Sequence, residues 1–176
     1  LFKSETNDVR TNITKIKSVS PSALYVLTQT PDKMQTVLVQ ISEMGLKIPL
    51  LSNEFINTDL VLKKNPELAE GALYAEPKFD QARPETKAML DKYIAKYGSL
   101  FGGLPPVYIT TYYDSVYLLD GIINKVGNDS DKIKQELYST NNWNGSAGLL
   151  TLDKNGDPMY EYVVKTIKDG KSVNAQ

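Results

Sequence analysis

Three polar side chains, Ser52, Asn53 and Glu54, interrupt the otherwise apolar stretch IPLLSNEFI. A carboxylate in such a place suits a positively charged nitrogen, and hydroxyl and amide groups can fix the orientation of a small molecule. The stretch therefore predicts a binding site for a small polar ligand that carries an amino group.

A second polar cluster, Thr28-Gln29-Thr30, follows another apolar run at positions 23–27. Both runs have the length of a buried strand, and ligands of parallel α/β sheets bind beyond the carboxyl ends of the strands. If the two strands are neighbours, both clusters open into the same crevice. The candidate ligand-binding residues of this half are Thr28, Thr30, Asn53 and Glu54.

These polar groups also have purely structural explanations. Thr30 precedes Pro31 and suits the N-cap of a helix, while Ser52 and Asn53 could satisfy the backbone of a loop. Glu54 is harder to explain in this way, because apolar residues flank its cluster on both sides. For Glu54 we favour a role in binding.

The first half of the chain alternates strand-like and helix-like segments. Apolar strands separated by amphipathic helices predict an α/β fold, a parallel sheet with helices on both faces and right-handed crossovers. The expected helices begin after Asp8, after Thr30 and near Leu60, and the expected strands cover 23–27, 48–51 and 71–75.

After Glu76-Pro77 the pattern changes to long helices. We expect helices at 84–97, 106–126 and 132–138, and two strands, 145–153 and 160–167, on either side of the turn at 154–157. DKNGD (153–157) resembles the start of a calcium loop, but Pro158 stands where the loop needs glycine and Val164 where it needs glutamate.

The helix expected at 106–126 carries an apolar stripe, which we assign to the core. Tyr108 is the exception, because it lies in the first turn, from which a side chain can reach a cleft. The stripe consists of Ile109, Tyr112, Val116, Leu119 and Ile123.

The composition excludes several kinds of chemistry. The 176 residues include no cysteine and no histidine, which removes thiolate metal sites, disulfides and the commonest general base. A formal net charge of -1, with lysines interspersed among acids, argues against nucleic-acid binding. No apolar run approaches the roughly 20 residues of a membrane helix. We expect no cofactor and no metal.

The order of the segments resembles that of the type I periplasmic binding proteins, and most of all the branched-chain amino-acid receptors of ABC importers. The resemblance rests on four pieces that together span nearly the whole chain. They are ITKIKSVSPSALYVLTQTPDKMQTVLVQISEMGLKIPLLSNEF, AEGALYAEP, YITTYYDSVYLLDGI and GSAGLLTLDKNGDPMYEYVVKTIKDGK.

The resemblance implies that this sequence lacks the N-terminal lobe of the family. It then divides into part of lobe 2 (1–76), a crossover with helices that belong to lobe 1 (77–153) and a hairpin return to lobe 2 (154–176). Glu54 matches an acid that commonly meets the ligand ammonium, and Tyr108 matches an aromatic wall residue. Thr30 departs from the family, which often has an aromatic residue there.

The leading hypothesis is a periplasmic or extracellular solute-binding protein, free or lipid-anchored, that binds an amino acid or similar molecule and delivers it to a membrane permease. A signal peptide would belong to the full-length protein. The alternatives are a sensor domain with the same fold and, less favoured, an enzyme that uses carboxylates such as Glu54, Asp80 or Asp114. The helices at 84–126 carry apolar faces that the missing lobe should cover, so we expect the chain as given either to pair with another copy through those faces or to rearrange them.

Overall fold

The computed structural model describes residues 6–100 and 104–175, which form two compact units. One unit contains the described residues up to Glu76 together with those from Val163 onward, and the other runs from Pro77 to Tyr162. The chain therefore passes from one unit to the other twice. The assignment of these units to the two lobes of the family stays a prediction.

Within the described residues, five strands form one mixed sheet in the order β1-β2-β3-β6-β7. β1, β2 and β3 are parallel, and β6 and β7 form an antiparallel hairpin. The α/β fold with a mainly parallel sheet is thus confirmed. The strands are β1 (Leu24–Val26), β2 (Leu50–Asn53), β3 (Leu73–Pro77), β6 (Tyr162–Lys168) and β7 (Lys171–Asn174).

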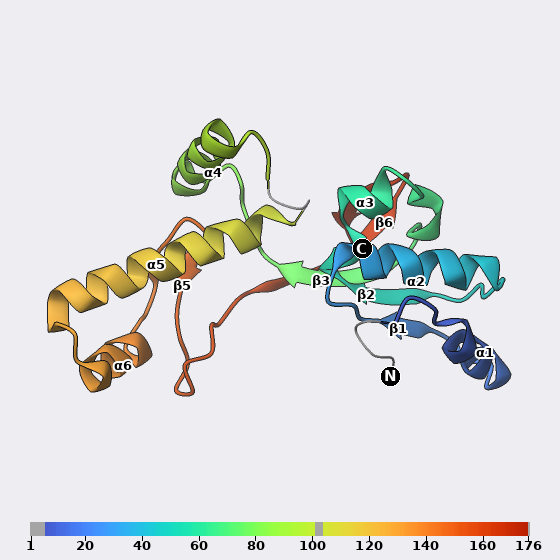
Figure 1. Cartoon of the computed structure of the whole chain (residues 1–176), viewed down its shortest axis with the longest axis horizontal. Coiled ribbons are helices and arrows are strands. Elements are labelled where there is room, and N and C mark those ends of the chain that lie inside the picture. The colour runs from blue at the N-terminus through green and yellow to red at the C-terminus, as the bar shows by residue number, and fades with distance from the viewer. Residues whose placement is uncertain (1–5, 101–103, 176) are drawn as a thin grey trace. The chain divides into compact units, whose positions relative to one another are not determined.

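One face of the parallel strands packs on helices, as Figure 1 shows for α2. Ser52 on β2 lies against Met34 of α2, and its register partners Val26 and Tyr74 are buried with it. The adjacent register row, Tyr25, Leu51 and Leu73, points to the opposite face and is exposed. The helical segments of this unit are α1 (Arg10–Ser18), α2 (Pro31–Glu43), η1 (Glu54–Ile56), α3 (Asp59–Leu62) and η2 (Pro66–Leu68).

The sequence of α2 explains both its ends and its buried face. Pro31 supplies the fixed φ of a first helical residue, and Gly45 leaves the helix with a φ of +63°. Apolar residues three and four apart bury one side of the helix. Gln40 on the same side accepts a hydrogen bond from Val9 N–H (2.7 Å) and donates to Asn7 O (2.8 Å), which ties the start of α1 to α2.

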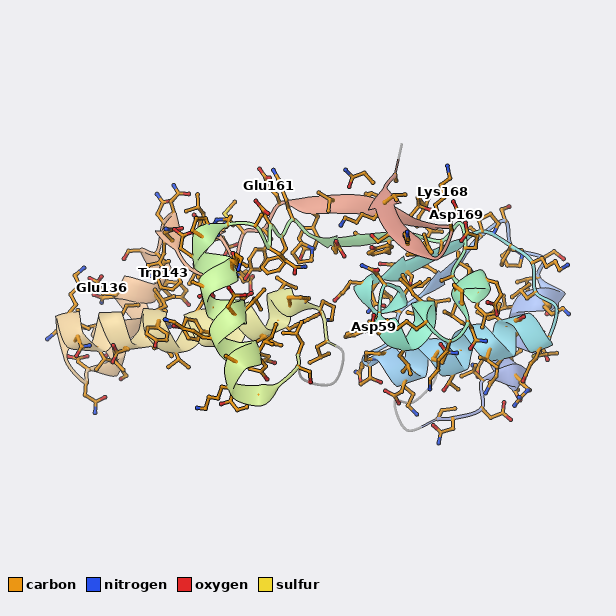
Figure 2. The ribbon with its side chains drawn as sticks, turned by 90° about the horizontal axis from the view of Figure 1, so that it is seen from above. Asp59, Glu136, Trp143, Glu161, Lys168 and Asp169 are labelled. Atoms are coloured by element: carbon orange, nitrogen blue, oxygen red, sulfur yellow. The ribbon has the colours of Figure 1, made fainter. Side chains whose placement is uncertain are left out.

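The β6–β7 hairpin turns at Asp169 and Gly170, and Figure 2 labels Asp169. Both residues have positive φ, as a type I′ turn requires. Glu70 accepts the N–H groups of Asp169 (3.0 Å) and Gly170 (3.4 Å), so the turn is held against the loop before β3.

The second unit is built on the 21-residue helix α5 (Pro106–Val126), with α4 (Pro84–Tyr97) and α6 (Ser130–Tyr138) beside it (Figure 1). Lys125 of α5 and Glu136 of α6, the latter labelled in Figure 2, form an ion pair of 2.5 Å. Two short strands, β4 (Trp143–Asn144) and β5 (Leu149–Leu150), pair antiparallel.

The assignment of the apolar stripe of α5 to the core is wrong for this structure. Tyr112, Val116, Leu119 and Ile123 are 73%, 66%, 40% and 41% exposed. The buried residues of the helix lie four apart on the other side, namely Thr110, Asp114, Leu118 and Ile122. The inward side carries a polar anchor together with the apolar residues Leu118 and Ile122.

That anchor is the buried carboxylate of Asp114. It accepts the N–H of Ser146 (2.7 Å), the hydroxyl of Ser146 (2.6 Å) and the N–H of Ala147 (2.6 Å). A Cβ atom at Gly145 would lie 2.4 Å from the same carboxylate, so the loop approaches as closely as glycine permits. Three donors compensate the desolvation of the charge.

Of the hairpin expected around 154–157, the turn forms but the two flanking strands do not pair with each other beyond one bridge. Asp153 accepts the N–H groups of Asn155 (2.7 Å) and Asp157 (2.9 Å), but the flanking residues share only the bridge between Leu152 and Pro158. The two hydrogen bonds of this bridge, from Asp153 N–H to Asp157 O (2.9 Å) and from Met159 N–H to Thr151 O (2.9 Å), lie on either side of Pro158. The predicted strands pair instead with β4 and β7.

Replacing Asp114 by alanine should lower the free energy of unfolding by about 2–4 kcal/mol, because three buried donors lose their acceptor. Asp120→Ala, on an exposed part of the same helix, should change it by less than about 0.5 kcal/mol. Urea unfolding followed by circular dichroism measures both. Equal losses for the two variants would contradict the anchoring role of Asp114.

Candidate functional site

The ends of β1 and β2 lie side by side in the first unit. The register pairs Leu24 with Leu50 and Val26 with Ser52, so the two strands run in the same direction and finish at one edge. Thr28 and Thr30 follow β1, Asn53 is the last residue of β2, and Glu54 begins η1. The structure therefore brings these four predicted residues to the same edge of the sheet.

Two side chains of β2 form hydrogen bonds with backbone carbonyl groups of the β1 segment, one within the strand and one just after it. Asn53 Nδ2 donates to Thr28 O (2.9 Å), and Ser52 Oγ donates to Val26 O (3.1 Å). Asn53 Oδ1 is buried without a hydrogen-bond partner among the residues that the structure describes. The structural explanation of Ser52 and Asn53 is therefore correct in part, because both fix the strand ends to one another.

Thr30 has its own contacts at the entrance to α2. Its φ of -147° is extended, as for an N-cap, but its side chain does not bond to the helix backbone. A hydrogen bond from the Thr30 side chain lowers the pKa of Asp32 below its ordinary value, and the hydroxyl of Thr28 donates to Thr30 O (3.2 Å). Thr30 is exposed and Thr28 is half-buried.

Glu54 lies half-buried at the start of η1, directly before two buried residues, Phe55 and Ile56. The buried pair fixes the short 3-10 helix to the core, so the backbone that carries the carboxylate is held in place. A carboxylate at the mouth of an apolar layer can bind a cation more strongly than one in bulk water.

A cavity of about 790 Å³ runs along β1 and between α1 and α2. Thr28 and Thr30 line it, together with Asp32 and Lys33, whereas Asn53 and Glu54 do not. Sequence reasoning missed this cavity and the two charged residues. No motif marks them, since the cavity is formed by residues of α1, β1 and α2 that are far apart in the sequence.

Tyr108 belongs to the second unit, in the first turn of α5. It lines a groove of about 710 Å³ between α4 and α5, together with Met89, Tyr93, Tyr97 and Tyr112. Asp114, one of the acids considered for an enzyme, belongs to the same unit. Its carboxylate already accepts the three hydrogen bonds from Ser146 and Ala147.

The described residues contain no group of three acidic side chains that could hold a metal ion. In the same part of the chain, no helix is both long and apolar enough to cross a bilayer.

The comparison with protein families gives one match. The family described as the receptor family ligand binding region matches residues 2–170. The chain belongs to this family. The resemblance to type I periplasmic binding proteins is thereby confirmed, and the strand ends described above lie in a ligand-binding fold.

Solved structures of the same fold include several solute-binding proteins. A leucine binding protein from Thermotoga maritima has a TM-score of 0.76 and 25% sequence identity, over 99% of this chain and 49% of that one. An isoleucine-bound substrate binding protein from Streptococcus pneumoniae has a TM-score of 0.71 and 21% identity, over 99% and 51%.

A benzoate-bound solute binding protein from R. palustris has a TM-score of 0.73 and 20% identity, over 97% of this chain and 46% of that one. This chain thus spans about half the length of these structures. No curated protein sequence matches it closely enough to be counted as a relative.

Replacing Thr30 by valine should raise the pKa of Asp32 toward its ordinary value, because the hydrogen bond that favours the carboxylate is lost. A lowered pKa stabilises the fold at pH values above the unfolded pKa of about 3.9, and this stability is lost as the pH falls through the native value. The variant should therefore be less stable than the parent near neutral pH. NMR titration of the Asp32 carboxyl measures the shift.

Thr28→Val is the matched control, because the Thr28 hydroxyl bonds to Thr30 O and not to Asp32. An unchanged Asp32 titration in Thr30→Val, or the same shift in both variants, would show that Thr30 does not stabilise this carboxylate.

Proposed function

We propose that this chain is the ligand-binding part of an extracytoplasmic solute-binding protein that serves an ABC importer. The ligand is an amino acid or a similarly small polar molecule, bound non-covalently and without turnover. The observation that carries the proposal is the convergence of Thr28, Thr30, Asn53 and Glu54 at the carboxyl edge of β1 and β2, in a chain of a ligand-binding family.

Each residue has a distinct role in this proposal. Glu54 accepts hydrogen bonds from the ligand ammonium, and Asn53 keeps the two strand ends together. Thr28 and Thr30 face the ligand side chain, where a small polar residue leaves more room than an aromatic one. Tyr108 is the aromatic ligand contact that the resemblance to the family implies.

In the full-length protein, binding would proceed by closure of two lobes around the ligand, as the resemblance to the family implies. The closed form would then be the one that a membrane permease recognises, because ligand binding stabilises it over the open form. The similar structure from R. palustris is the solute binding protein of an ABC transporter, and the one from S. pneumoniae is a transporter substrate binding protein, which supports this partner. A ligand-sensing receptor is the second candidate, and the description of the family as a receptor region supports it.

A thermal-shift screen of the full-length gene product against the standard amino acids tests the binding proposal. A ligand at 100 times its Kd should stabilise the protein by about 2.7 kcal/mol. Glu54→Gln should weaken binding of the preferred amino acid at least about tenfold, because a charge-assisted bond to the ammonium becomes a neutral one. Benzoate, which has no amino group, serves as the comparison ligand.

Glu67→Gln is the matched control, since it makes the same chemical change at an exposed site of the same unit. Its response to ligand should equal that of the parent. No response of the parent to any amino acid, or an equal response of Glu54→Gln, would contradict the proposed role of Glu54.

A further inference from the structure

The chain contains two Asn-Gly pairs, Asn144-Gly145 and Asn155-Gly156. In such a pair the backbone nitrogen of the second residue can close a five-membered ring on the side-chain amide carbon of the first. Glycine favours this reaction, because it has no Cβ atom to hinder the approach and its backbone rotates easily. Both pairs lie in the second unit, so their surroundings can be compared directly.

The pair Asn144-Gly145 is fixed by contacts on both of its residues. Asn144 Oδ1 accepts a hydrogen bond from Arg83 Nη2 (2.6 Å), and Asn144 Nδ2 donates to Glu85 (3.0 Å). Gly145 is buried, and the next two residues of the chain donate to the carboxylate of Asp114. Ring closure would have to rotate the peptide at Gly145, which requires that these contacts open first.

The pair Asn155-Gly156 lies in the turn at 153–157 and is held less firmly. Asn155 is exposed, and the hydrogen bond from its side-chain amide to the Asp153 carboxylate is 3.4 Å long, beyond the usual range. Gly156 N–H donates to Asp153 O (3.0 Å), and ring closure must break this bond. The bond belongs to a short turn at the surface, where backbone hydrogen bonds open at little cost in free energy.

The residues around Asn155 are those of a surface that faces water. Lys154, Asp157 and Pro158 are exposed, as Asn155 is. Lysine and aspartate are rarely buried unless they are paired, so a turn of this composition is a poor surface for contact with another part of the protein. We therefore expect water to reach Asn155 in the full-length protein as well.

We propose that Asn155 is a site of spontaneous deamidation, whereas Asn144 is protected by its contacts. Gly156 N loses its proton to water or hydroxide and attacks Asn155 Cγ. The bond between Cγ and Nδ2 then breaks, and Nδ2 leaves as ammonia, so that a cyclic imide remains. Water adds to either carbonyl group of the imide and opens it to aspartate or isoaspartate, with no change of oxidation state.

The product alters the turn in two ways. It adds one negative charge to a segment that already contains Asp153 and Asp157. The isoaspartate form also inserts a methylene group into the backbone, which changes the spacing of the N–H groups that Asp153 accepts from Asn155 (2.7 Å) and Asp157 (2.9 Å). This inference is independent of the proposed ligand and of its site.

Incubation of the folded protein at mildly alkaline pH, followed by peptide mass spectrometry, tests the proposal. Cleavage after lysine separates the two pairs into peptides 135–154 and 155–165, and fragment spectra locate the modified residue in each. Asn155 should convert to the acid at least about tenfold faster than Asn144, because the loop at Gly145 must first lose its bonds to Asp114. A sample that has not been incubated gives the background.

Two controls separate the effect of the fold from that of the local sequence. Asn155→Gln should abolish the reaction at this position, since glutamine would have to close a six-membered ring. In guanidinium chloride the two pairs should react at similar rates, because the unfolded chain lacks the contacts that protect Asn144.

Three outcomes would overturn the proposal. They are no conversion of Asn155 above the background, equal rates at the two pairs in the folded protein, and the same excess of Asn155 over Asn144 in guanidinium chloride as in the folded protein. The last of these would mean that the neighbouring residues in the sequence, and not the fold, protect Asn144.

Discussion

The parallel hydrogen bonding of β1 to β2 is the constraint on which the candidate site depends. Strands that run in the same direction finish at the same edge, so the residues that follow them become neighbours although more than twenty positions separate them in sequence. The bonds from Ser52 and Asn53 to the backbone of the β1 segment reinforce this pairing at its end. An antiparallel pairing would place Thr28 and Glu54 at opposite ends of the sheet.

In the second unit a buried charge has the comparable role. Asp114 binds Ser146 and Ala147 from the buried side of α5, which it shares with Leu118 and Ile122, while the apolar stripe lies on the outer side. Burial of an ion is favourable only when donors replace the lost water, and the loop supplies three of them. The same interaction therefore holds the loop against α5.

Much of this architecture could be predicted from the sequence, because the signals are local. The periodicity of 31–44 and of 106–126 gave both helices close to their observed bounds, and Pro31 and Gly45 marked the ends of α2. The polar residues after the two apolar runs marked the edge of the sheet. Periodicity does not say which side of an amphipathic helix is buried, and the Asp114 contact on the buried side of α5 spans 32 positions.

The failure of the predicted hairpin has a similar cause, since the turn at 153–157 formed but the segments on either side of it pair with β4 and β7, which lie elsewhere in the sequence. The cavity along β1 also depends on packing that no short motif encodes. The most direct test of the central claim is a crystal structure of the full-length protein with its preferred amino acid. We expect the ligand ammonium within hydrogen-bond distance of Glu54, beside the ends of β1 and β2. A ligand bound away from that edge would contradict it.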